Sequence, residues 1–169
     1  THPHKDMEIL TYVLSGTVEH QDSMGNKEQI PAGEFQIMSA GTGVRHSEYN
    51  ASSSDPLHLY QIWIIPERTG IEPRYAQRRF PDVKGRQLVL TPDAREGSLK
   101  VYQDMTLSRW VFSAGEKDEV ALETGRRVWI QVVKGEIRVN GETARASDAF
   151  AVWDEASLTI EASSDAEVL

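Results

Sequence analysis

Two pairs of side chains with the same spacing could together bind a metal ion. His46 and Glu48 are two residues apart, and so are His2 and His4 at the start of the chain. Residues i and i+2 of a β-strand point to one face, so each pair would present its side chains together. Imidazole and carboxylate groups are good ligands for divalent first-row metals. Either pair alone is more typical of a solvated strand face, but four such groups in a chain with five histidines favour a metal site.

Composition limits the classes of function that remain. The 169 residues suit one large or two small domains, and 39% hydrophobic and 26% charged residues predict a folded protein. A net charge of −8 argues against nucleic acid as a direct partner. The absence of cysteine excludes disulfides and zinc–sulfur sites and fits a cytoplasmic protein. No apolar run is long enough for a membrane span. Because a ligand candidate directly follows Thr1, we expect the chain to be a fragment of a longer protein.

Short runs rich in β-branched and aromatic residues predict an all-β chain. Besides the segment with His46 and Glu48, the predicted strands are 9–20 with a bend at Gly16, 34–39, 57–65, 88–90, 99–105, 110–112, 128–133, 136–139, 150–153 and 158–161. Asn140-Gly141 predicts a hairpin turn, because both residue types tolerate positive φ. Segment 66–86 contains three prolines and two glycines and predicts an irregular connection with room for a short helix.

An internal repeat divides the chain. Residues 12–18 match 131–137 in pattern, and 31–35 find a weaker match in 146–150, with a register uncertain by one residue. Two copies of a short-stranded β unit predict two stacked barrels or sandwiches, and only the first copy carries histidines. We therefore predict a metal-binding domain at 1–65, a connection at 66–86 and a metal-free domain at 87–169.

Several motifs resemble those of the cupin superfamily: His2-x-His4-x₃-Glu8, Gly16, Gly25-x₅-Pro31-x-Gly33 and His46-x₃-Asn50. The spacing departs from the usual cupin pattern between Glu8 and Gly16 and between Gly33 and His46. These departures, the HPHK opening and the segments 20–26, 31–36 and 39–48 resemble the pirin family, and especially the bacterial pirin-like proteins described as quercetin dioxygenases. The resemblance covers nearly the whole chain. It implies two cupin (jelly-roll-like) β-barrels in tandem, the first lacking its N-terminal strands and the second degenerate.

The resemblance also implies a site and a reaction. The metal, most commonly Fe(II) with other first-row divalent ions as alternatives, would be held by His2, His4, His46 and Glu48. Glu48 would also accept the proton of the substrate, and Glu8 would not be a ligand. The implied reaction is cleavage of quercetin-like flavonols with O2. The alternative is a redox-responsive interaction module with a protein partner or self-association, and a third reading is a bicupin that retains the fold with little activity.

Other polar and aromatic residues receive structural interpretations. We expect His20 to lie on the surface and His58 to be a hydrogen-bonded structural residue in an apolar strand. One of Gln36 and Met38 would line the cavity, with core packing as the alternative. We expect the four tryptophans, Trp63, Trp110, Trp129 and Trp153, to contribute to core or inter-domain packing.

Overall fold

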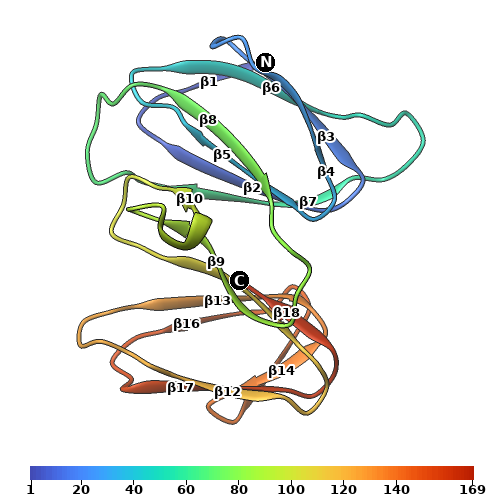
Figure 1. Cartoon of the computed structure of the whole chain (residues 1–169), viewed down its shortest axis with the longest axis vertical. Coiled ribbons are helices and arrows are strands. Elements are labelled where there is room, and N and C mark those ends of the chain that lie inside the picture. Colours follow the sequence, from blue (N-terminus) through green and yellow to red (C-terminus); the bar gives the residue numbers. More distant parts are fainter. The chain divides into compact units, whose positions relative to one another are not determined.

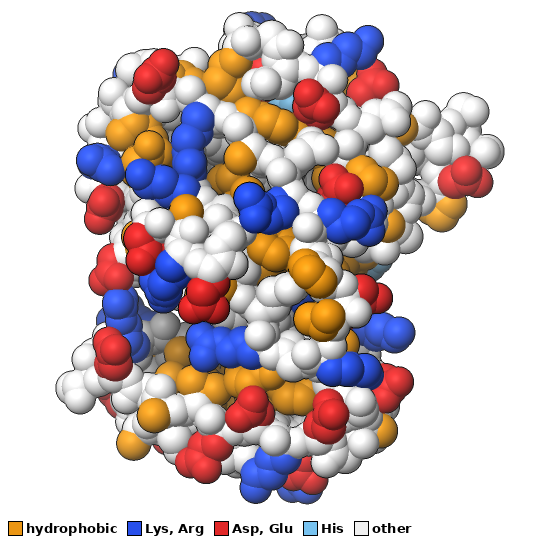
Figure 2. Space-filling model, in the orientation of Figure 1, with side chains coloured by type: hydrophobic (Ala, Val, Ile, Leu, Met, Phe, Trp, Pro, Cys, Tyr) orange, Lys and Arg blue, Asp and Glu red, His pale blue; other side chains and the backbone are white.

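The computed structural model describes residues 1–169 and confirms an all-β fold (Figure 1). Eighteen strands are joined by turns and loops, and the one helical element is a 3₁₀ turn, η1 (Arg95–Gly97). The structure contains no helix with the length and apolar character needed to cross a membrane. On the face drawn in Figure 2, Lys and Arg side chains are interspersed with Asp and Glu.

The chain divides into two compact units. The first unit comprises Thr1–Pro81 and Val89–Thr106, and the second comprises Asp82–Leu88 and Leu107–Leu169. The domain boundaries drawn from the sequence, at 65 and 87, stay a prediction.

The first unit contains two four-stranded sheets. One has the order β1-β6-β3-β4: β1 (His2–His4), β6 (Val44–Asn50), β3 (Thr17–Asp22) and β4 (Lys27–Pro31). The other has the order β7-β2-β5-β8: β7 (His58–Ile64), β2 (Glu8–Ser15), β5 (Glu34–Ser39) and β8 (Arg74–Arg79). Buried apolar side chains from both sheets pack together, as Ile9, Met38 and Val44 do. A short strand, β10 (Leu99–Lys100), pairs with the end of β9 (Gly85–Thr91).

The second unit repeats this plan. One sheet has the order β12-β17-β14-β15: β12 (Lys117–Ala121), β17 (Ser157–Ala162), β14 (Glu136–Val139) and β15 (Glu142–Arg145). The other includes, in this order, β11 (Leu107–Phe112), β18 (Ala166–Val168), β13 (Val128–Lys134) and β16 (Ala149–Val152). One continuous hydrophobic core, which includes Trp110, Ile137 and Ile160, lies between the two sheets. The predicted tandem of two cupin-type barrels is confirmed.

The two copies agree in detail around a shared glycine. Gly16 and Gly135 have φ of +79° and +81°, and a Cβ on either would overlap backbone atoms. Ala32 N–H donates to Gly16 O, and Ala146 N–H donates to Gly135 O, both at 3.0 Å. Ala32 therefore matches Ala146, which fixes the register that the sequence left uncertain by one residue.

Two strand predictions are wrong. The stretch expected to be irregular or helical contains β8, because all six of its residues pair with β5, from Glu34↔Arg79 to Ser39↔Arg74. The predicted strand 99–105 ends after Lys100. Beyond that point, the backbone N–H of Tyr102 donates to the Glu8 carboxylate instead of to a neighbouring strand.

Candidate metal centre

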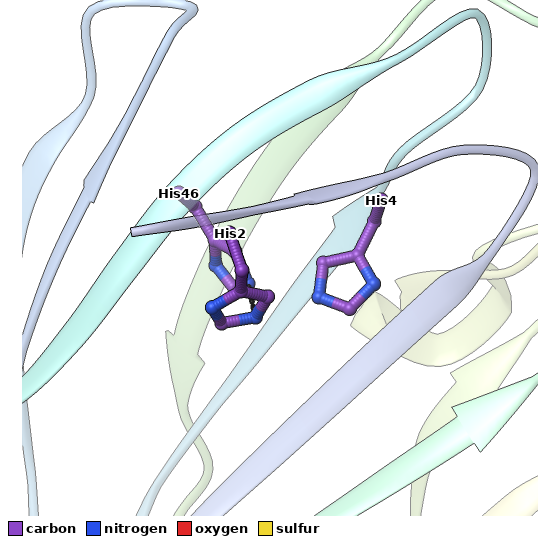
Figure 3. Close-up of side chains that lie close together, drawn as sticks. All are labelled: His2, His4 and His46. Carbon is purple, nitrogen blue, oxygen red and sulfur yellow. Dashed lines mark hydrogen bonds between the residues drawn. The ribbon is translucent and has the colours of Figure 1, made fainter.

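Strand pairing brings three histidines together. β1 pairs antiparallel with β6 so that His2 lies opposite His46, and the two Nε2 atoms are 3.0 Å apart. His4 is two residues further along β1, and its ring centroid is 4.7 Å from that of His2 and 4.9 Å from that of His46. Figure 3 shows the three imidazoles projecting to the same side of the two strands. Their ligand atoms all lie within 4.8 Å of one another, so they could hold one metal ion.

The environment lowers the pKa of His4 and of His46. His46 is 1% exposed, and burial, followed by the nearby His2, His20 and His4, lowers its pKa to about 4. Burial and His2 also lower the pKa of His4, against a smaller opposing effect of Glu48. A metal binds the unprotonated ring nitrogen, so a lowered pKa leaves the ligand ready at neutral pH. The convergence of the three imidazoles fits a divalent first-row metal.

Glu48 extends the cluster along β6. Its Oε2 accepts a hydrogen bond of 2.7 Å from Gln61 Nε2, and Oε1 accepts one of 3.5 Å from Thr11 Oγ1. Glu48 belongs to a second candidate ligand set, with His46 and His20, whose ligand atoms also lie within 4.8 Å of one another. The four residues predicted as ligands therefore fall into two sets that share His46. Their roles as ligands remain predictions.

The expectation that His20 lies on the surface is wrong. β3 lies between β6 and β4 in its sheet, and the His20 side chain is fully buried. Its Nε2 is 3.0 Å from Asp22 Oδ2, while its Nδ1 has no hydrogen-bond partner. Burial tends to raise the pKa of Asp22, but hydrogen bonds from His20 and Asn26 outweigh it and hold this pKa below its usual value. The signal in the sequence was His20-x-Asp22, a third pair of ligand-type residues with i, i+2 spacing.

Several other interpretations change with burial. His58 is exposed rather than structural, because β7 is an edge strand in which no residue is fully buried. Among the tryptophans only Trp110 is buried, whereas Trp63, Trp129 and Trp153 are more than half exposed. Met38 packs in the core, and Gln36 is fully buried with neither amide atom hydrogen-bonded.

The second copy carries apolar side chains at the positions of this cluster. His20 is four residues after Gly16, and Val139 is four residues after Gly135. The matching cross-strand pairs follow from the registers: His20↔Glu48 corresponds to Val139↔Ile160, His2↔His46 to Val120↔Leu158, and Thr11↔Gln36 to Ile130↔Phe150. All six residues of the second copy belong to its hydrophobic core or pack against it. The polar interior is therefore specific to the first unit.

Comparisons with known proteins cover nearly the whole chain. The family model described as Pirin matches residues 1–64, and the one described as Quercetinase C-terminal cupin domain matches residues 88–169. A protein of Escherichia coli (strain K12) named quercetin 2,3-dioxygenase is 69% identical over 169 residues, which are 100% of this chain and 73% of that protein. A protein of Pasteurella multocida (strain Pm70) named putative quercetin 2,3-dioxygenase PM1685 is 52% identical over 99% of this chain and 73% of its own length.

Solved structures agree with this relationship. YhhW from Escherichia coli superimposes with a TM-score of 0.98 at 68% identity, covering 99% of this chain and 71% of that chain. The bacterial pirin YhhW in complex with nickel(II) superimposes with a TM-score of 0.96 at 68% identity, covering 99% of this chain and 72% of that chain. The relative thus binds a metal ion, and the His/Glu cluster of the present chain could hold one.

Proposed function

This chain belongs to the pirin family, and from that premise we propose that it is a metal-dependent dioxygenase that cleaves quercetin-like flavonols with O2. The observation that carries the proposal is the convergence of His2, His4 and His46, with lowered pKa values at His4 and His46, beside a hydrogen-bonded carboxylate. Relatives that carry the name quercetin 2,3-dioxygenase support the choice of substrate.

We assign the metal to His2, His4, His46 and Glu48, with Fe(II) as the proposed ion. Three imidazoles and one carboxylate suit a divalent first-row metal and leave coordination positions for small molecules. When bound, such an ion supplies Lewis-acid and redox chemistry for the reaction of the flavonol with O2. The buried, neutral state of His46 maintains a ligand nitrogen without competition from a proton at neutral pH.

Glu48 is the group that we assign to proton transfer. A flavonol reacts with O2 from its deprotonated 3-hydroxyl form, so the site needs an acceptor for that proton. Glu48 Oε2 is held by the Gln61 side-chain amide at 2.7 Å, and Gln61 Oε1 accepts the indole N–H of Trp63 at 3.0 Å. This chain of hydrogen bonds fixes the direction of the carboxylate. Gln61 and Trp63 are therefore positioning residues for Glu48.

Trp63 also provides an aromatic surface beside the histidines. Its indole ring lies edge-on to His4, with ring centroids 5.3 Å apart, and is 57% exposed. A flat, polycyclic substrate gains stacking energy on such a surface. Trp63→Phe would keep an apolar ring but remove the N–H bonded to Gln61, so it separates stacking from the positioning of Glu48.

The proposal is tested with the metal-loaded protein, aerobic quercetin and the decay of the visible absorbance of quercetin, together with detection of carbon monoxide. We expect one CO per O2 consumed, and a fall in kcat of about 100-fold or more for Glu48→Gln. His58→Gln, which changes an exposed histidine of β7, is the matched control and keeps wild-type turnover. Absence of turnover at every metal loading would refute the dioxygenase function.

The ligand assignment is tested separately by elemental analysis after dialysis. We expect His4→Ala to lose metal relative to wild type, because one imidazole of the cluster is removed. Unchanged metal content in His4→Ala would show that the ligand set is wrong, whatever the activity of the variant.

A further inference from the structure

We propose that His20 is a metal ligand, and that His20, His46 and Glu48 form an inner ion position beside the outer position, which is the site already assigned to His2, His4, His46 and Glu48. The two positions share His46 and Glu48. The proposal rests on the proposed function in one respect, namely that this barrel binds a divalent metal. It extends that function by adding a fifth ligand residue. The primary observation is that the ligand atoms of His20, His46 and Glu48 all lie within 4.8 Å of one another.

The contacts of His20 match those of metal-binding histidines, in which one ring nitrogen is hydrogen-bonded to a carboxylate and the other is free to bind the ion. Asp22 Oδ1 accepts the backbone N–H groups of Met24 and Asn26, and Oδ2 accepts the Asn26 side-chain amide at 2.8 Å. A carboxylate held by these donors is an acceptor, so Nε2 of His20, 3.0 Å from Oδ2, is the protonated nitrogen. In that tautomer the other ring nitrogen, Nδ1, carries the lone pair. Metal-ligating histidines commonly donate their other ring N–H to a carboxylate in this way.

His20 is also held in one orientation. Its ring packs against Tyr75, with centroids 4.8 Å apart, and is 5.4 Å from the ring of His46. The Tyr75 hydroxyl donates to Gln77 Oε1 at 2.6 Å, so Tyr75 is itself fixed. Directly across the strand ladder from His20 is Glu48. A fixed imidazole opposite a carboxylate is a preorganised pair of ligands.

The repeat shows that the fold does not require a histidine here. Val139 and Ile160 occupy the positions of His20 and Glu48 in the second copy, and both are buried in its hydrophobic core. A fully buried imidazole with an unpartnered Nδ1 is unfavourable unless a ligand satisfies that atom. In the first unit this unsatisfied atom lies beside His46 and Glu48, and a bound ion would satisfy it.

The two positions differ in how firmly the chain holds them. The outer position depends on β1, a three-residue strand at the edge of its sheet. The inner position depends on β3 and β6, which are both flanked by strands on two sides. The inner position therefore retains an ion when His2 and His4 are lost or displaced.

The experiment measures Co²⁺ binding by the full chain, using elemental analysis and the visible absorption spectrum of the bound ion. Wild type is compared with His2→Ala/His4→Ala, with that double variant plus His20→Val, and with the double variant plus His58→Val. Valine at position 20 reproduces the residue of the second copy, and circular dichroism checks the fold. His20→Gln, which retains an amide donor for Asp22, provides a second variant if valine unfolds the unit.

We expect the double variant to bind one Co²⁺ with a dissociation constant 10- to 1,000-fold above that of wild type. Adding His20→Val to the double variant should raise this dissociation constant at least another 10-fold. Adding the control substitution His58→Val should leave the dissociation constant of the double variant unchanged. The proposal is overturned if the double variant binds no Co²⁺, or if adding His20→Val or His20→Gln changes neither its affinity nor its spectrum. A wild-type protein that binds no Co²⁺ would overturn the metal-dependent function as well. If wild type turns over quercetin but substitution of His20 changes neither Co²⁺ affinity nor spectrum, only the inner position is overturned.

Discussion

The low pKa of His46 predicts that the metal-free protein loses stability in mild acid. An unfolded histidine titrates near 6.5, whereas burial and neighbouring histidines lower the pKa of His46 in the folded protein to about 4. Between these two pKa values, His46 is protonated in the unfolded state and neutral in the folded state. Stability is therefore fully present above pH 6.5, falls as the pH decreases towards 4, and stops falling from this cause below 4.

The magnitude follows from the same two values. The interval between 6.5 and about 4 corresponds to roughly 3 kcal/mol, and with His46 only 1% exposed, solvent screens little of it. His4, whose pKa is also lowered, adds a contribution of the same sign. The charged and titratable groups around His46 are His2 and His4 from β1, His20 and Asp22 from β3, and Glu48 on β6 itself.

Urea unfolding of chelator-treated protein between pH 4 and 8 measures this effect. We expect His46→Gln to lose less stability than wild type as the pH falls from 6.5 to 4, since glutamine does not titrate. His58→Gln, at an exposed position, should retain the wild-type pH dependence. If wild type and His46→Gln lose the same stability over this range, His46 is not buried as a neutral imidazole and the reasoning fails.

Three further predictions concern the repeat, the turn and the metal. Gly135→Ala should lower the free energy of unfolding by about 2–4 kcal/mol, because its Cβ would lie 2.3 Å from Asp165 O. Gly125 has a similar φ but nothing within 4 Å of an added Cβ, so Gly125→Ala should lower it by only about 1 kcal/mol. Equal losses of stability for the two variants in urea unfolding would contradict this. Asp22→Ala should lower stability by about 2–3 kcal/mol by removing the acceptor of three turn hydrogen bonds, and Asp22→Asn should lower it less; thermal unfolding that ranks the two variants in the opposite order would exclude the turn as the cause. A divalent metal at 100 times its dissociation constant should stabilise the protein by about 2.7 kcal/mol; an unchanged urea midpoint would argue against a site in the folded state.

Local signals in the sequence predicted much of this fold. The hairpin at Asn140-Gly141 is confirmed, with φ of +48° and +90°, because the requirement for positive φ is a property of the two residues themselves. The alternation of side chains placed His2 and His4 on one strand and correctly paired His46 with Glu48 along another. The pairing of β1 with β6 did not follow from any local pattern, and the family resemblance implied only that His2, His4, His46 and Glu48 hold one metal.

Burial was the part that local patterns could not supply. β8 consists of arginine, glutamine, tyrosine and alanine, an unusual strand composition, and forms a strand through its pairing with β5. His20 was misjudged because a polar residue near a turn is usually exposed. Its exposure is decided by the face of β3 on which it lies: Gln21 on one face is exposed, whereas His20 on the other packs against Tyr75 of the opposite sheet. All four tryptophans were assigned to core or inter-domain packing, but Trp63, Trp129 and Trp153 are more than half exposed. Trp63 lies on the edge strand β7, in which no residue is fully buried.

The comparison between the two copies gives the strongest reason to regard the polar interior of the first unit as functional. The strand pairs that carry His20, Glu48 and His46 recur in the second unit with Val139, Ile160 and Leu158, each 3% exposed or less. The same ladder is thus compatible with an ordinary apolar core. Replacing such residues by imidazoles and a carboxylate gives up hydrophobic burial, and each buried polar atom left without a partner costs about 1–3 kcal/mol more. The second copy forms the same strand pairs without these groups, and the imidazoles and carboxylate of the first copy are donors that suit a divalent metal ion.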